Sequence, residues 1–123
     1  MSSQRFGKAR RVRRSGEYQK AFQAGIRMHG RFLTLVMAPN DRSTVRLGIV
    51  ASRKLGDAVT RNRAKRLIRE AFRRTIAYGP ADGVDVVVIP RRGVADARYD
   101  SLQVDFSDTF TRGVSRIRGH AGR

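Results

Sequence analysis

The pattern of hydrophobic and polar positions along the 123-residue chain predicts three strands. Residues 31–38 (RFLTLVMA) and 45–52 (VRLGIVAS) are rich in apolar and β-branched residues, and a turn-forming cluster at 39–43 separates them. We therefore expect these two segments to pair as an antiparallel hairpin. Residues 84–89 form an apolar run between a glycine and a proline, which predicts a strand that is buried on both faces and central in its sheet.

Three other segments have apolar residues at three- and four-residue steps, the period of an amphipathic helix. The first is residues 15–25, which a serine can cap and a glycine can end. The second and longest spans residues 60 to about 77. The third follows the loop 91–98, where Asp100 and Gln103 resemble a capping box. Its apolar positions are Leu102, Phe106, Phe110, Val114 and Ile117.

This order of elements predicts an α+β fold, with one small, mostly antiparallel sheet packed with three helices in the order αββαβα. A length of 123 residues fits a single domain, 1–123, whose core needs neither a disulfide nor a structural metal. Residues 1–14 hold six lysines and arginines and only Phe6 and Val12 to bury, which is typical of a flexible basic arm. We expect residues 119–123 to be a frayed tail.

The net charge changes this picture from a generic small domain to a protein with an anionic partner. The chain has 27 lysines and arginines against 10 acids, a formal charge of +17, and 20 of the 27 lie in residues 1–74. Solubility needs a magnitude of only about 2 to 8, so the excess indicates binding to a polyanion. The absence of cysteine excludes a disulfide scaffold, a thiolate zinc site and a cysteine nucleophile, and favours a reducing compartment.

The sequence also bears on location. No apolar run is long enough to span a membrane, and the N-terminal segment lacks the apolar stretch of a secretory signal. We therefore expect a cytoplasmic protein with no membrane partner.

The helix expected at 60–77 has two unlike faces. One is an apolar stripe of Ala64, Leu67, Ile68, Ala71 and Phe72. The other is a cationic ridge of Asn62, Arg66, Arg69 and Arg73, flanked by Arg63 and Lys65.

The ridge works against the stability of its own helix. Like charges four residues apart cost roughly 0.2 to 0.5 kcal/mol per pair, and Arg61 and Arg63 in the first turn oppose the helix dipole. These costs are intelligible if phosphates bind along the ridge and at the exposed amides of the helix N-terminus. A solvated polar face is the alternative, and Asn62 fits either interpretation.

The stretch VASRKLGDAVTRNRAKRLIREAFR resembles the signature of the protein subunit of bacterial ribonuclease P, in which Arg-Asn-Arg opens a basic helix and Lys-Arg and Arg-Glu follow. The matching positions here are Arg61, Asn62, Arg63, Lys65, Arg66, Arg69 and Glu70. The basic arm, the first helix, the strands and the closing helix follow the family's order too, so the resemblance covers nearly the whole chain.

The resemblance implies a fold with a left-handed βαβ crossover, contrary to the usual right-handed rule. It also implies a function: a ribonucleoprotein endonuclease that removes the 5′ leader from precursor tRNA. The catalytic RNA subunit and its Mg²⁺ ions would do the chemistry, and the protein would assist. The partners expected on this basis are the catalytic RNA and precursor tRNA, with no obligate protein partner and no cofactor held by the chain itself.

The resemblance also assigns two sets of binding residues. The helix that opens with Arg-Asn-Arg would contact the catalytic RNA through Arg61, Asn62, Arg63, Lys65, Arg66 and Arg69, and the ridge adds Arg73. A cleft would hold the single-stranded leader, with Tyr18, Phe22, Arg53 and Lys54 as candidates.

Aromatic rings beside cations suit an unpaired strand, since stacking contributes roughly 1 to 3 kcal/mol per base. Tyr18 and Phe22 could instead pack the first helix on the sheet. The family often has a further aromatic residue in the strand lining the cleft, and Phe32 has no secure match to it.

The chain itself lacks the residues of a protein nuclease. His29 and His120 stand alone, on an expected loop and in the tail, and Asp82 and Asp85 are expected to bound a turn rather than hold a metal. We therefore expect no catalytic residue and no metal site in the protein. Two other classes remain open: a ribosomal or other structural RNA-binding protein, and a duplex-DNA-binding protein.

Overall fold

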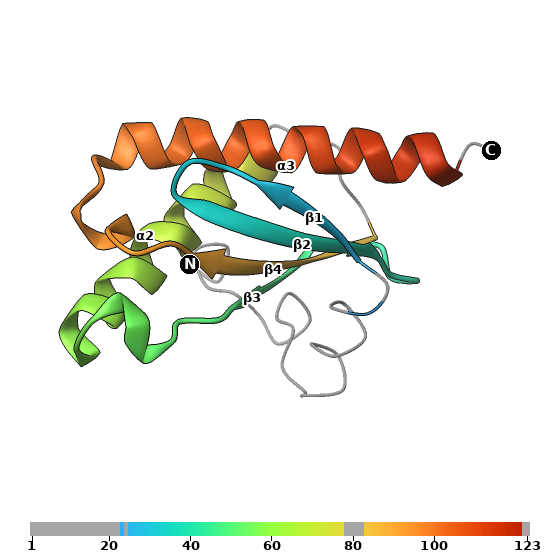
Figure 1. The fold of residues 1–123 in the computed structure, drawn as a ribbon. Helices are drawn as coiled ribbons and strands as arrows, with labels where there is room; N and C mark the ends of the chain where they lie inside the picture. Colours follow the sequence, from blue (N-terminus) through green and yellow to red (C-terminus); the bar gives the residue numbers. More distant parts are fainter. Residues whose placement is uncertain (1–22, 24, 78–82, 122–123) are drawn as a thin grey trace.

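The computed structural model describes residues 23, 25–77 and 83–121. Within them, a four-stranded sheet carries two α-helices on one face (Figure 1). The elements are β1 (Ile26–His29), β2 (Leu33–Pro39), β3 (Arg46–Ile49), α2 (Ala58–Ala77), β4 (Val84–Pro90) and α3 (Tyr99–Ala121), with short 3₁₀ turns η3 (Arg53–Leu55) and η4 (Val94–Asp96). The expected α+β class is confirmed.

The hairpin expected from residues 31–38 and 45–52 is wrong. Both segments contain strands, β2 and β3, but β4 lies between them in a sheet of order β1-β2-β4-β3. β4 pairs antiparallel with β2 and parallel with β3. The prediction that the strand at 84–89 is central is confirmed. Three consecutive valines of β4 are fully buried, so the strand needs a neighbour on each side.

The hairpin that the chain does form lies one strand earlier. β1 pairs antiparallel with β2 across a turn closed by a hydrogen bond of 2.8 Å from the Gly30 amide to the Leu33 carbonyl. β1 has four residues, two of them exposed, so its alternation is too short to recognise in the sequence. His29 consequently lies at the end of a strand and not on a loop, which corrects our expectation.

The strands β3 and β4 and the helix α2 between them form a parallel βαβ unit. Its left-handed sense stays a prediction. The helix expected at residues 15–25 lies almost wholly outside the described residues. The described part of the chain thus has four strands and two α-helices, so the predicted order αββαβα is not reproduced there because it omits β1.

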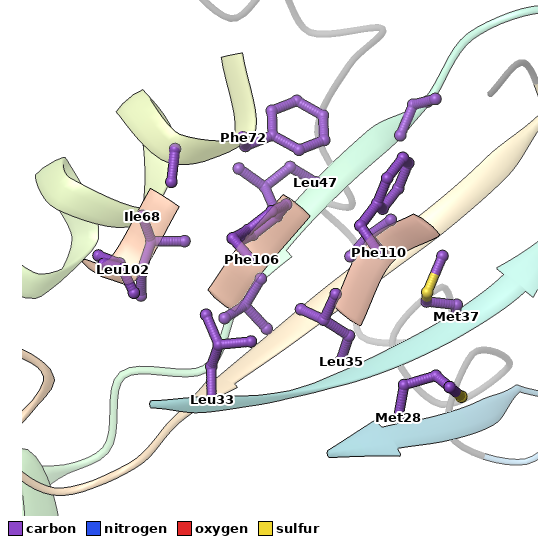
Figure 2. Packing of buried hydrophobic residues seen from close by; sticks show 14 of the residues in the cluster. Met28, Leu33, Leu35, Met37, Leu47, Ile68, Phe72, Leu102, Phe106 and Phe110 are labelled. Atoms are coloured by element: carbon purple, nitrogen blue, oxygen red, sulfur yellow. The ribbon is translucent and has the colours of Figure 1, made fainter. Parts of the chain in front are cut away.

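The main core fills the space between the helices and one face of the sheet. Figure 2 shows side chains of α2 and α3 above those of β2. Phe106 pairs with both Phe72 and Phe110, at ring-centroid distances of 6.2 and 6.3 Å. Four of the five residues of the predicted apolar stripe are fully buried. The exception is Leu67, which is only partly buried at the edge of the core.

The helix ends differ from the sequence-based expectation in two places. α3 begins at Tyr99, so Asp100 lies in its first turn and the expected capping box with Gln103 does not form. Gln103 instead bonds to Tyr99 and to Thr75 of α2. α3 also continues to Ala121, so residues 119–121 are helical and not a frayed tail.

Candidate nucleic-acid interface

The cationic ridge lies on the side of α2 that faces away from the sheet. The ridge residues Asn62, Arg66 and Arg69 and the flanking Arg63 are exposed, whereas Arg73 of the ridge and the nearby Arg61 and Lys65 are half-buried. Most of the seven residues predicted to bind the catalytic RNA therefore lie on the exposed side of α2, and Arg61 is the exception. The side chain of Arg61 is partly turned inward. Its Nε is buried and has no hydrogen-bond partner among the described residues.

The N-terminus of α2 is capped by an acid that the sequence analysis did not single out. The Thr60 amide donates to Asp57 Oδ1 at 2.9 Å, and the Arg61 amide donates to the Asp57 carbonyl at 2.9 Å. The hydrogen bonds from Thr60 hold the pKa of Asp57 below its ordinary value. The side chain of Asp57 thus occupies the Thr60 amide, one of the helix amides expected to bind phosphate, and the phosphate site itself stays a prediction.

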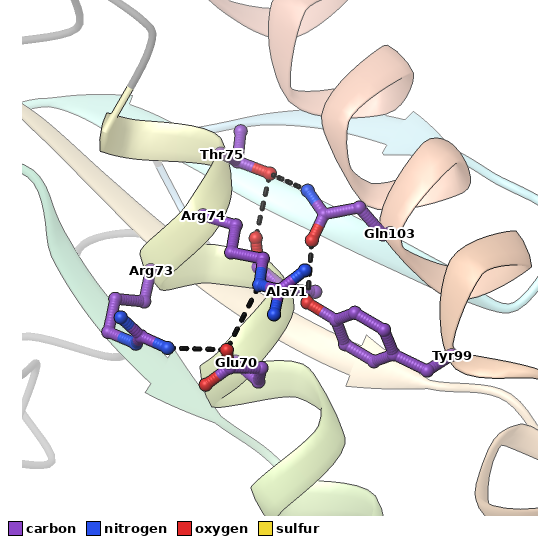
Figure 3. A network of polar contacts seen from close by, with 7 residues as sticks. All are labelled: Glu70, Ala71, Arg73, Arg74, Thr75, Tyr99 and Gln103. Carbon is purple, nitrogen blue, oxygen red and sulfur yellow. Dashed lines mark hydrogen bonds and ion pairs between the residues drawn. The ribbon is translucent and has the colours of Figure 1, made fainter. Parts of the chain in front are cut away.

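The C-terminal half of the ridge contains a polar network that the sequence analysis also missed (Figure 3). Glu70 Oε2 accepts hydrogen bonds from Arg73 and, at 3.1 Å, from Arg74 Nε. The guanidinium of Arg74 also lies over the ring of Tyr99, 5.3 Å from its centroid. Arg73, chiefly, holds the pKa of Glu70 below its ordinary value, and burial raises the pKa of Tyr99.

Two basic loops meet at the edge of the sheet where the parallel strands end. Arg53 and Lys54 are exposed in η3, which follows β3 after residues 50–52, and they lie in a loop as the sequence predicts. Arg91 and Arg92 are exposed directly after β4, and Arg92 Nε donates to the Lys54 carbonyl at 3.4 Å. We call these four residues the loop patch. Parallel strands end at the same edge of a sheet. The parallel pairing of β3 with β4 therefore places Arg91 and Arg92 beside Arg53 and Lys54.

The loop patch adjoins the ridge because α2 begins three residues after η3. Gly56, in this short connection, has φ = 134°, a conformation that other residues rarely adopt. The turn at Gly56 leads directly to the capping residue Asp57.

Tyr18 and Phe22, the aromatic candidates for leader binding, lie outside the described residues. Phe32 precedes β2, packs against the main core and lies beneath the guanidinium of Arg31, 4.8 Å from its ring centroid. Phe32 is therefore not a residue of β2, and it instead lines an open surface pocket together with Arg31 and residues of α3.

His29 and Asp85, which the sequence analysis expected to have no metal-binding role, each contact a neighbouring strand. His29 Nδ1 lies 3.1 Å from Thr34 Oγ1 of the neighbouring strand. Asp85 does not bound a turn as expected; it is buried within β4 and forms an ion pair with Arg46. Asp82 and the side chain of His120 lie outside the described part of the chain.

The described ranges contain no metal-binding cluster and no membrane-spanning helix. Within 25–77 and 83–121, no three histidines, cysteines or acids are grouped closely enough to hold a metal ion. The helices described there are too short or too polar to cross a membrane.

Curated relatives of this chain are proteins of one kind. The Ribonuclease P protein component of Chromohalobacter salexigens is 43% identical over 96 residues, a match that covers 76% of this chain and 73% of that protein. The Ribonuclease P protein component of Syntrophomonas wolfei is 33% identical over 116 residues, with 89% of this chain and 97% of that protein covered.

The family model and the solved structures agree with these relatives. Residues 6–113 match the family model described as Ribonuclease P. The RNase P protein from Thermotoga maritima superposes with a TM-score of 0.75 at 30% identity, covering 83% of this chain and 96% of that one. The Staphylococcus aureus RNase P protein gives a TM-score of 0.73 at 30% identity, with 85% and 94% covered. In sequence and in fold, the chain belongs to the family of the bacterial ribonuclease P protein component.

Proposed function

We propose that the chain is the RNA-binding subunit of ribonuclease P, which assists a catalytic RNA in removing the 5′ leader from precursor tRNA. The observation that carries this proposal is the cationic ridge, which is exposed on α2 at the positions of the family signature. In this proposal the ridge binds the catalytic RNA. The catalytic groups and the required Mg²⁺ ions belong to that RNA, and the protein contributes binding and orientation.

Binding through the ridge is expected to depend strongly on salt, because each phosphate neutralised by an arginine or lysine releases counterions. Six such contacts lower the affinity by about a thousandfold between roughly 50 and 200 mM salt. The measurement is the dissociation constant of the full chain for the catalytic RNA across this range. A flat salt dependence would remove the ridge from the interface.

We propose that the loop patch binds the single-stranded leader, together with Tyr18 and Phe22. Exposed guanidinium and ammonium groups suit the phosphates of an unpaired strand, and aromatic rings suit its bases. The patch adjoins the N-terminal end of the ridge, so one RNA complex could contact both surfaces.

The test of leader binding compares precursor tRNA with mature tRNA, each bound to the reconstituted holoenzyme. Tyr18→Ala should reduce the preference for the precursor by roughly 1 to 3 kcal/mol, the contribution of one stacked base. For precursor binding, the logarithm of the affinity falls linearly with the logarithm of the salt concentration. Lys54→Ala and Arg92→Ala should each make this slope shallower by about one.

Arg42→Ala is the matched control for the loop patch, because Arg42 is exposed in the turn at the opposite end of the sheet. Equal losses for both tRNAs, or an equal loss in the control, would place the leader elsewhere. Competition by ribosomal RNA or duplex DNA as strong as that of precursor tRNA would favour a general nucleic-acid-binding protein instead.

A further inference from the structure

Glu70 is the one acid in α2, a helix whose exposed face is otherwise cationic. An acid on a phosphate-binding surface repels the ligand by simple electrostatics. Its presence there calls for a compensating role. The contacts that its carboxylate makes indicate what that role is.

Glu70 and Tyr99 hold Arg74 from two sides (Figure 3). Glu70 Oε2 accepts from Arg74 Nε at 3.1 Å, and the same oxygen accepts from Arg73 Nη2. The ring of Tyr99 lies under the guanidinium of Arg74 at 5.3 Å. The ring is held in turn, because the Tyr99 hydroxyl donates to Gln103 Oε1 at 2.6 Å.

The network also joins α3 to α2. Gln103 Nε2 donates to Thr75 Oγ1 at 3.1 Å, and the Thr75 hydroxyl donates to the Ala71 carbonyl at 2.7 Å. Thr75 and Ala71 are both buried. The support beneath Arg74 is therefore anchored in the packed interface between the two helices, and not on a free surface side chain.

We propose that Glu70 is a positioning residue, which holds Arg73 and Arg74 as an ordered pair that binds phosphates of the catalytic RNA at the C-terminal end of the ridge. A guanidinium has five N–H donors, and Glu70 engages one from each arginine. Among the described residues, the remaining donors of both guanidiniums have no hydrogen-bond partner, so we expect them to be available to a ligand. This inference rests on the proposed RNA-binding function and adds Glu70, Arg74 and Tyr99 to its binding surface.

Two opposing effects decide whether removing the charge of Glu70 weakens or strengthens RNA binding. Ordering one flexible side chain on binding reduces affinity roughly twofold to tenfold, so holding two arginines in place beforehand avoids a substantial loss. Repulsion between Glu70 and a phosphate is weaker, because two guanidiniums neutralise the carboxylate and the side chain is partly exposed to screening solvent. We therefore expect the positioning effect to exceed the repulsion.

The test measures the affinity of the full chain for the catalytic RNA at fixed salt. Glu70→Gln should weaken binding about fivefold to tenfold, although it makes the protein more positive by one charge. Asp108→Asn is the matched control, because Asp108 also accepts from an arginine four residues later, Arg112 Nε at 3.2 Å, but lies on α3. The control should bind as the wild type does, or slightly more tightly.

Glu70→Asp tests the positioning role without a change in net charge. The shorter side chain cannot reach both arginines, so positioning predicts a loss of about twofold to tenfold, whereas a purely electrostatic role predicts none. In an Arg73→Gln background, Glu70→Gln should cause a smaller loss than in the wild type, because one of its two targets is gone. Thermal unfolding of each variant shows whether a loss of affinity reflects a loss of fold.

The outcomes separate this inference from the proposed function. Tighter binding by Glu70→Gln, together with unchanged binding by Glu70→Asp, would overturn the positioning role while the wild type still binds. If the wild-type chain does not bind the catalytic RNA, the proposed function itself fails. If Glu70→Gln does not fold, Glu70→Asp decides the question alone.

Discussion

Arg46 and Asp85 form a buried ion pair that holds β3 against β4. Arg46 Nε and Nη2 donate to the two oxygens of Asp85 at 2.8 and 2.7 Å, and the side chains are only 8% and 12% exposed. Asn40 Nδ2 donates to Asp85 as well, at 2.7 Å. The two charged residues are also register partners across the parallel strands. Their bidentate geometry therefore favours the register that brings the two loops of the loop patch together.

Removing one member of this pair should be far more damaging than removing both. Asp85→Ala leaves a buried guanidinium with its carboxylate missing, and we expect a loss of about 3 to 5 kcal/mol in the free energy of unfolding. The double variant Arg46→Met/Asp85→Leu should recover most of that loss. Urea denaturation of the single and double variants measures both effects. A loss below about 1 kcal/mol for Asp85→Ala would mean that the pair is not buried as described.

The cap of α2 should make part of the stability depend on pH. The pKa of Asp57 is lowered from 3.8, first by the hydrogen bond from the Thr60 amide. A group with a lowered pKa in the folded state stabilises the protein above its unfolded pKa, and this contribution disappears as the pH falls through the folded value. Asp57→Asn keeps an acceptor but cannot titrate.

The thermal midpoint of the wild type relative to Asp57→Asn should therefore fall as the pH is lowered from neutral to about 2.5. Using the difference between the two proteins cancels the titration of the other acids. A difference that stays constant over this range would contradict the cap.

At the scale of single elements, the two faces of α2 should respond to substitution in opposite ways. Arg63→Ala and Arg66→Ala remove exposed side chains, so we expect weaker binding to the catalytic RNA and a change in stability of less than about 0.5 kcal/mol. Ile68→Ala and Phe72→Ala leave cavities at fully buried positions and should each lower the free energy of unfolding by roughly 2 to 5 kcal/mol. Filter binding and chemical denaturation separate the two classes, and arginine variants that unfold early but bind normally would reverse the assignment.

Gly113 lies where α3 packs against Met37 of β2 and Met28 of β1. A Cβ atom there would lie 2.2 Å from the Sδ of Met37 and 3.2 Å from the Cγ of Met28. Alanine usually favours a helix by about 1 kcal/mol relative to glycine. Gly113→Ala should nevertheless destabilise the protein, because Met37 is fully buried and its side chain has to shift within the packed core.

Gly119→Ala is the control for Gly113→Ala, because a Cβ at Gly119 meets nothing within 4 Å and the residue is exposed in the same helix. It should be neutral or stabilising. Thermal midpoints of the two variants that move in the same direction would refute the close packing at Gly113.

The local pattern is sufficient to predict the two described helices and the central strand but not the pairing of the strands. The helix expected at 60–77 agrees with α2 to within two residues, and the run at 84–89 is buried and central. Strand partners depend on contacts between distant segments, so the turn at 39–43 was misread as a hairpin turn. The buried acid of β4 was likewise assigned to a turn, because only its partner on β3 explains a charge inside a strand.

At the scale of the whole molecule, the fold gathers basic residues from separate segments around one end of α2. The ridge was predictable because its residues share a single helix. The contribution of Arg91 and Arg92 was not, because it depends on β3 and β4 ending at the same edge. The roles of Asp57 and Glu70 also required the structure, since each depends on which hydrogen bonds its carboxylate accepts.

The most direct test of the proposed function is a cleavage assay in which the catalytic RNA of ribonuclease P processes precursor tRNA at a low concentration of Mg²⁺. We predict that adding the wild-type chain accelerates removal of the 5′ leader, and that the folded double variant Arg63→Ala/Arg66→Ala accelerates it much less. The chain alone, without the RNA, should leave the precursor uncut. An unchanged rate on adding the wild-type chain, or cleavage by the chain alone, would contradict its assignment as an assisting RNA-binding subunit.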